Sequence, residues 1–156
     1  MNTTITLSVT ELMTDITNKS HLETEGIESP DVKYRIQVGT EKKDEIYRAL
    51  VSVNSSLTRL VHRYLVSSTL DTATDAVTTP ATFPISFVYV LDLSDRRKAA
   101  KAQPLADKMH DYLVHYTLAK FYASVSQGDL SNVHSALTQE ASAEIESLLY
   151  DKLPPQ

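Results

Sequence analysis

The side chains with the widest chemical repertoire in this chain are its five histidines. His110 and His115 are five residues apart in a segment of helical periodicity, which places them on different faces of a helix. The acids that flank them, Asp107 and Asp111, fall at no spacing typical of a zinc or di-iron site. The spacing therefore predicts no metal centre. The other histidines are interpreted as polar or boundary residues: His21, His62 and His134.

Covalent and acid–base catalysis lack their usual combinations of residues. There is no cysteine, and no serine or threonine lies in a pattern that resembles a strand-to-helix nucleophile elbow. Glu140 and Glu144 are one turn apart on a helix that has a separate apolar stripe, which favours a solvated face over an acid–base pair. Three glycines, spread over the chain, cannot build a phosphate-binding loop. We therefore expect no enzymatic activity and no cofactor.

Four aromatic residues could stack on nucleic-acid bases: Tyr112, Tyr116, Phe121 and Tyr122. Stacking platforms normally lie in a positively charged groove, whereas the net charge of the chain is −5. Tyr112 and Tyr116 also follow core spacing. The basic residues between 96 and 101 are the only real support for nucleic-acid recognition. Because of their spacing, we expect Tyr112 and Tyr116 to belong to a core.

Charge is distributed unevenly along the chain. Four basic residues cluster in one short segment, Arg96, Arg97, Lys98 and Lys101. The last part, 129–156, has five acids against the single base Lys152. Such asymmetry suits head-to-tail contact between copies in a ring, with Arg96, Arg97, Lys98 and Lys101 as candidate interface residues. The alternative is two solvated faces.

Hydrophobic periodicity predicts a mainly helical protein with a small β element. A capping box of Ser8 and Glu11 starts the first helix, and Pro104 is expected to break or restart the third. The predicted helices are 9–23, 41–67, Leu105–Val125 and Leu130–Leu149, and the predicted strands are 31–38 and 85–93. The last two helices meet at Gly128, so we expect a C-terminal antiparallel helical hairpin within a bundle of about four helices.

The predicted strand 85–93 is apolar on both sides. This pattern indicates a strand that is covered on both faces or that lies at a subunit contact. Phe87 and Tyr89, with Phe83 just before the strand, are therefore further candidate interface residues.

The chain of 156 residues is expected to form one domain, 1–156, with a flexible arm at 67–84. The arm is rich in serine and threonine and contains no glycine, and we expect it to become ordered against a partner. Its alternatives are a solvated linker or an irregular β-hairpin. No apolar run approaches the roughly 20 residues that cross a bilayer, so a soluble protein made in the cytoplasm is expected.

The segment from Ile85 to Leu153 resembles the C-terminal part of small phage head-tail connector proteins, also called neck or adaptor proteins. The resemblance lies in the strand ISFVYVLDLS, the helix MHDYLVHYTLAKFYASV and the closing helix LSNVHSALTQEASAEIESLLYDKL. Short proteins of Bacteroidales phages and prophages have a similar layout. The long Ser/Thr segment and the two strands depart from the simplest connectors.

The resemblance implies a virion structural protein of the neck or tail region, made in the host cytoplasm. Its partners would be further copies of itself in a ring, commonly of twelve subunits, together with the portal protein and tail or other neck proteins. DNA would pass through the channel only as cargo. Two alternatives remain, a tail terminator or completion protein and a small helical binding or regulatory module.

Overall fold

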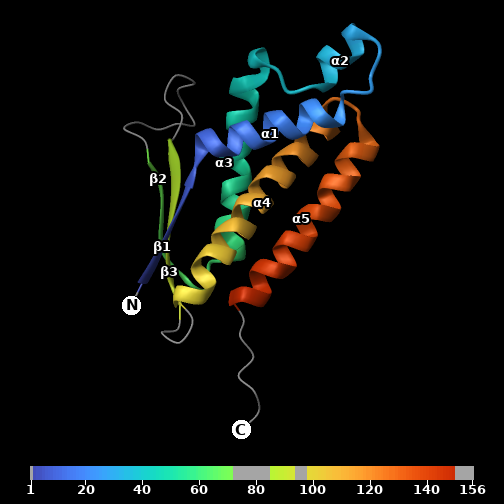
Figure 1. Ribbon diagram of the computed structural model, residues 1–156. Coiled ribbons are helices and arrows are strands. Elements are labelled where there is room, and N and C mark those ends of the chain that lie inside the picture. Colours follow the sequence, from blue (N-terminus) through green and yellow to red (C-terminus); the bar gives the residue numbers. More distant parts are fainter. Residues whose placement is uncertain (1, 72–84, 94–97, 150–156) are drawn as a thin grey trace.

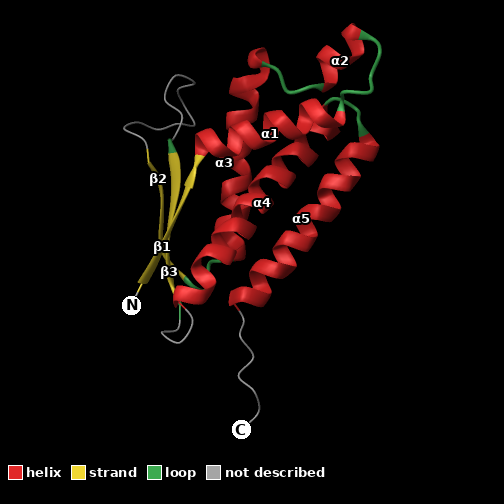
Figure 2. Ribbon diagram, in the orientation of Figure 1, coloured by secondary structure: helices red, strands yellow, loops and turns green. Residues whose placement is uncertain are grey.

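The computed structural model describes residues 2–71, 85–93 and 98–149. A small antiparallel sheet lies along one side of a layer of long helices (Figures 1 and 2). The elements follow in the order β1 (Asn2–Ser8), α1 (Val9–Glu23), α2 (Pro30–Ile36), η1 (Thr40–Lys42), α3 (Lys43–Leu60), β2 (Leu65–Asp71), β3 (Ser86–Asp92), α4 (Lys98–Ser124) and α5 (Gly128–Leu149). The expected fold class, mainly helical with a small β element, is confirmed.

The sheet has the order β1-β3-β2, and both pairings are antiparallel. The expected strand 85–93 is β3, the central strand. One face of the sheet packs on the helices through Ile5, Leu7, Phe87 and Leu91, all buried. Segment 31–38, the expected partner of β3, is absent from the sheet. Strands β1 and β2 pair with the two sides of β3 instead.

The helices predicted for the first half pack through the expected stripes. The Oγ of Ser8 accepts a hydrogen bond from the backbone N–H of Glu11 at 3.4 Å, and α1 ends at Glu23 as predicted. On α3 the buried apolar side chains are spaced three or four residues apart, as helical periodicity predicts: Ile46, Leu50, Val53 and Leu57. These residues join α1 and α4 in one hydrophobic core.

The C-terminal hairpin of α4 and α5 is confirmed, and the two helices lie side by side along their length (Figure 1). The expected break at Pro104 is wrong, because α4 continues through this residue. A proline removes one backbone donor, and the core contacts of Leu105 and Met109 hold the helix on the following turn. In the tight turn, the residue with positive φ (62°) is Ser126, while Gly128 begins α5.

The expected strand at 31–38 is wrong. Residues Pro30–Ile36 form α2, with Pro30 in its first turn, where a missing N–H costs little. The ammonium group of Lys42 donates hydrogen bonds to the carbonyls of Tyr34, Arg35 and Gln37 at 2.6 to 2.9 Å. A helix end leaves such carbonyls without partners, so the side chain of Lys42, a few residues further along the chain, stabilises the end of α2.

The helix predicted for 41–67 is too long, and the arm predicted for 67–84 starts too early. The chain leaves α3 after Leu60 and enters β2 at Leu65. Strand β2 pairs with β3, with a register shift between Leu65 and Ser67. Residues 67–71 of the predicted arm thus belong to β2, while residues 72–84 lie outside the described residues.

Candidate functional site

Two of the candidate interface residues, Phe87 and Tyr89, belong to the core of the subunit. Each is 1% exposed. The hydroxyl of Tyr89 donates a hydrogen bond to Oδ1 of Asn54 on α3, and burial raises the pKa of Tyr89. These two rings fasten β3 to the helices, so they offer no surface to a second copy.

Two of the four basic candidates lie at the start of α4. Lys98 and Lys101 belong to its first turn, next in sequence to the end of β3. Arg96, Arg97 and Phe83 lie outside the described residues. For the predicted basic interface, the structure therefore gives only the backbone positions of Lys98 and Lys101. They lie at the end of the molecule where α4 begins (Figure 1).

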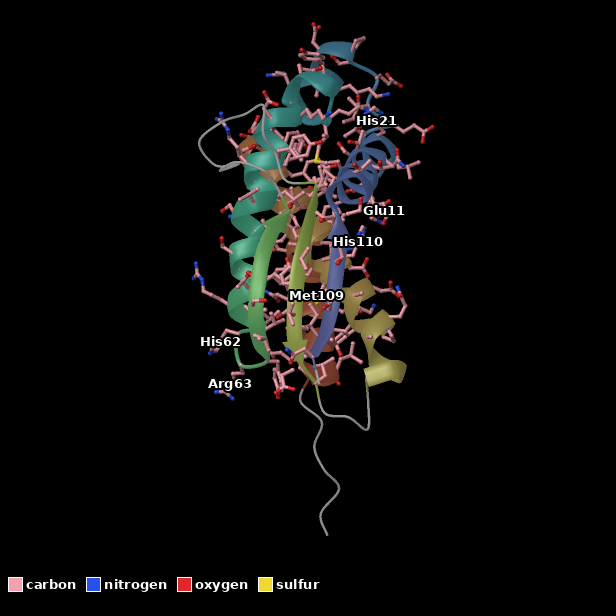
Figure 3. The ribbon with its side chains drawn as sticks, turned by 90° about the vertical axis from the view of Figure 1, so that its left-hand side faces the viewer. Glu11, His21, His62, Arg63, Met109 and His110 are labelled. Carbon is pink, nitrogen blue, oxygen red and sulfur yellow. The ribbon has the colours of Figure 1, made fainter. Side chains whose placement is uncertain are left out.

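The outer face of the sheet is the surface that the two-sided pattern of β3 predicts. Val88 and Val90 point away from the helices and are partly exposed. The register places Thr6 opposite Val88, and Thr4 and Ser67 on either side of Val90. In Figure 3 this face is turned to the viewer, and none of the described helices covers it. We call the surface of Thr4, Thr6, Ser67, Val88 and Val90 the open sheet face.

The other sequence candidates are structural or solvated. Tyr112, Phe121 and Tyr122 are buried in the core, so the four aromatic residues do not form an exposed stacking platform. Glu140 is exposed, and Glu144 forms an ion pair with Lys108 on α4 at 2.8 Å. These carboxylates therefore bind their own chain or water.

A buried polar cluster joins α1, α4 and α5. His134 on α5 is 3% exposed. Its Nε2 lies 2.8 Å from both carboxylate oxygens of Glu23 on α1, and its Nδ1 lies 3.0 Å from Nδ1 of His115 on α4. The His134 ring stacks between the rings of His115 and Tyr122, with centroid distances of 5.2 and 5.6 Å.

The hydrogen-bond partners fix the tautomers of this cluster when both imidazoles are neutral. Nε2 of His134 faces a carboxylate, so it donates, and its Nδ1 must then accept a hydrogen bond from Nδ1–H of His115. Burial, the neighbouring His134 and the ammonium of Lys19 lower the pKa of His115 to about 4. Burial also raises the pKa of Tyr122 to about 12. At neutral pH the network therefore holds a neutral His115.

This geometry is suited to holding helices together. Both nitrogens of His134 are engaged by the protein, so neither is free to accept a proton from a substrate. Among the residues that the structure describes, no group of three or more His, Asp or Glu is arranged to hold a metal ion. The cluster is a polar part of the core.

No local pattern in the sequence indicates this cluster, because hydrophobic periodicity predicts the inward face of α5 from its apolar residues alone. That periodicity places Val133 on the inward face, but its side chain is 53% exposed. The inward positions nearby are instead the polar residues His134 and Thr138, whose hydroxyl donates to the carbonyl of His134 at 2.7 Å. The spacing of 134, 138, 141 and 145 along one helical face is the pattern that would have revealed it.

Comparison with known protein families, curated proteins and solved structures finds no match. In the described part of the chain no helix is both long and apolar enough to cross a membrane.

Proposed function

We propose that this chain is a virion structural protein, a head-tail connector or adaptor that forms a ring between portal and tail. The observation that carries the proposal is the open sheet face. The central strand β3 uses Phe87 and Tyr89 to fold the subunit, while Val88 and Val90 form an apolar strip between two rows of hydroxyl side chains. Such a face is typical of a surface that another protein covers.

The resemblance of residues 85–153 to phage connectors supports the same proposal. Its two helices correspond to α4 and α5, which form a long antiparallel hairpin. The basic segment at the start of α4 lies at one end of this hairpin and offers a charged contact to a neighbouring copy or to the portal. Ring closure multiplies contacts that are individually weak.

The deciding experiment uses the portal protein that the proposal requires, taken from the same genome as this chain. The chain is purified alone and together with that portal, and the particles are measured by mass photometry and negative-stain electron microscopy. A symmetric ring on the portal, expected with twelve subunits, supports the proposal. A stable species of 17.4 kDa that ignores the portal contradicts it and favours a small binding module, whereas binding to tail-tube protein alone favours a tail terminator.

A pair of matched variants tests the open sheet face. Val88→Thr with Val90→Thr keeps the β-branched shape and the strand propensity but makes the strip polar. We expect a weaker ring and an unchanged circular dichroism spectrum. The control is Leu22→Ser, which removes a side chain that is 70% exposed on α1, away from the sheet. Equal assembly of the valine variant and the control would exclude this face from the interface.

The basic segment is tested by charge reversal. Arg96→Glu with Arg97→Glu should weaken ring or portal contact at low salt, where charge contacts are least screened. Reversal of two exposed arginines elsewhere, Arg35→Glu with Arg48→Glu, changes the net charge equally. If both double variants assemble alike at low salt, the segment makes no such contact.

A further inference from the structure

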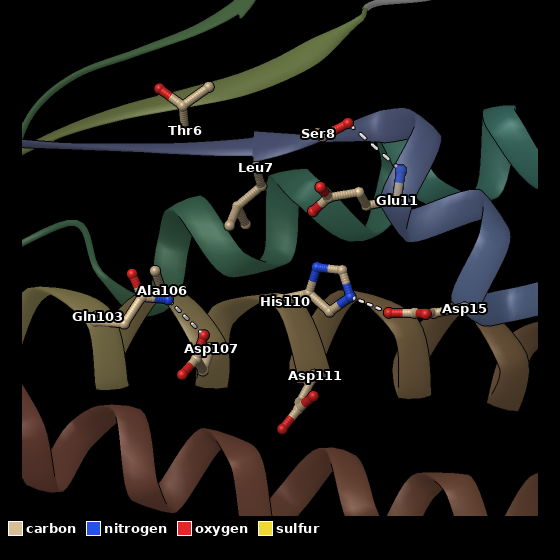
Figure 4. A pocket seen from close by; sticks show the side chains of 10 residues that line it. All are labelled: Thr6, Leu7, Ser8, Glu11, Asp15, Gln103, Ala106, Asp107, His110 and Asp111. Carbon is tan, nitrogen blue, oxygen red and sulfur yellow. Dashed lines mark hydrogen bonds and ion pairs between the residues drawn. The ribbon is translucent and has the colours of Figure 1, made fainter.

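The geometry points to a second binding surface, a groove along β1 that accepts an extended, basic segment of a partner protein as an added strand. This inference goes beyond the connector proposal and does not depend on it. The groove has a volume of about 420 Å³ and is lined by residues of β1, α1 and α4. In the described part of the chain, no strand pairs with the edge of β1 opposite β3, which we call its free edge. Figure 4 shows β1 and the start of α1 above α4, with Leu7, Glu11 and His110 between them, while Thr6 points to the far side of β1 and Asp111 points away from β1.

The free edge of β1 supplies backbone hydrogen-bond groups. The N–H of Val9 donates to the carbonyl of Ile85 at 3.1 Å, in register with the pairs Leu7–Phe87 and Ile5–Tyr89. Antiparallel pairing alternates between residues that bond to the neighbouring strand and residues whose N–H and C=O point away from it. Thr4 and Thr6 therefore direct their backbone groups to the edge, and Thr6 lines the groove.

This edge lacks the usual protection against pairing. Natural edge strands often have a charged residue, a proline or a bulge that prevents another strand from adding. Strand β1 has the sequence NTTITLS and an unbroken register with β3, whereas β2 at the other edge contains a register shift. Strand addition to such an edge is a common way to bind an extended peptide.

The charge of the groove selects the partner. Its walls contain four carboxylates, from Glu11 and Asp15 on α1 and from Asp107 and Asp111 on α4. Asp15 is paired with His110 at 2.6 Å, and Asp107 accepts a hydrogen bond from Gln103 at 2.8 Å. Lys108 lies 3.9 Å from Asp111 but also pairs with Glu144. The groove is thus acidic and suits lysine or arginine at alternate positions of an incoming strand.

The same charges disfavour strand β1 of a second copy as the added strand. Pairing of β1 with β1 of another copy would bring two sets of these carboxylates together, and like charges at short range are repulsive. A β1 strand also has no charged side chain of its own to compensate them. The occupant is therefore a different, basic segment.

A synthetic peptide tests the inference. It has seven residues that alternate lysine with valine or threonine, with blocked ends, and its binding to the full chain is measured by calorimetry and by amide NMR. We expect saturable binding that weakens with salt and that shifts the amide signals of Thr4 and Thr6. The same peptide with glutamate for lysine should not bind. Absence of binding of the lysine peptide at millimolar concentration would overturn the inference.

Two comparisons separate strand addition from simple attraction of charges. Asp107→Asn with Asp111→Asn should weaken binding at least fivefold, whereas Glu140→Gln with Glu146→Gln, which changes the net charge equally on α5, should not. A lysine peptide with methylated backbone amides keeps its charges but cannot donate to the edge, and it should lose binding. If it binds as well as the unmodified peptide, or if the two double variants behave alike, the groove is not a strand acceptor.

Discussion

Acidification is expected to destabilise this protein through His115. Its imidazole is held neutral in the folded chain by burial, by His134 on α5 and by Lys19 on α1, which together lower its pKa to about 4. In the unfolded chain the pKa returns to its ordinary value of 6.5. Between these two values the unfolded chain binds a proton that the folded chain does not, so stability falls as the pH falls from 6.5 towards 4.

The size of this effect follows from the two pKa values. At about 1.36 kcal/mol for each pH unit, the difference between 6.5 and about 4 corresponds to at most roughly 3.4 kcal/mol. His115 is partly exposed, so water and salt screen part of this penalty, and we expect a loss of about 1 to 2 kcal/mol in the free energy of unfolding. That loss is a substantial share of the stability of a small domain.

The assay compares the natural chain with His115→Gln. Glutamine keeps a side-chain amide that can donate to His134 but does not titrate. Urea unfolding is measured at several pH values from 7.5 to 4.5, and the difference between the two chains at pH 7.5 reports the lost contact alone. The natural chain should lose about 1 to 2 kcal/mol more than the variant on acidification. Parallel curves, or an imidazole NMR titration of His115 centred near 6.5, would refute the reasoning.

Three further changes test other contacts by chemical denaturation. Tyr89→Phe leaves Oδ1 of Asn54 buried without its donor and should cost about 1 to 3 kcal/mol, and Asn54→Leu added to it should restore part of the loss; a double variant no more stable than Tyr89→Phe contradicts this. Lys42→Met removes three hydrogen bonds to helix-end carbonyls, so amide exchange in 34–37 should become faster, and unchanged exchange would show that α2 does not need them. Ser126→Gly relieves a positive φ of 62° and should raise stability by up to about 1 kcal/mol; a lower melting temperature would contradict that.

The helices could be predicted wherever a long apolar stripe decides the structure. The stripes of α1, α3 and α4 each supply several large side chains to one core, and each buried side chain contributes about 1.5 to 3 kcal/mol. Local sequence therefore agrees with tertiary packing, and the hairpin of α4 and α5 follows from the short connection between them. The alternation of side chains along 85–93 likewise predicts the strand β3.

The predictions are wrong where residues outside a segment decide its secondary structure or its contacts. Segment 31–38 alternates like a strand, but Lys42 and Pro30 stabilise the helix α2, and β1 and β2 take both sides of β3. Strand β1 has little alternation of its own beyond Ile5 and Leu7, and it forms because β3 offers it a partner. The cluster of His115, His134 and Glu23 joins three helices, and no local window of the sequence contains it.

The two candidate contact surfaces, the open sheet face and the edge of β1, differ in whether the sequence indicates them. Strand β3 has more apolar side chains than the core of the chain can bury. The remaining ones, Val88 and Val90, therefore indicate a contact face in the sequence itself. The edge of β1 binds through backbone groups, which every residue possesses, so no residue type marks it. The edge of β1 gains its preference for a basic partner from the nearby carboxylates of α1 and α4. These helices lie beside β1 only in the folded chain, so the sequence does not show their proximity. The face and the edge thus select unlike partners, since an apolar face accepts a neutral surface while the acidic groove accepts a basic strand.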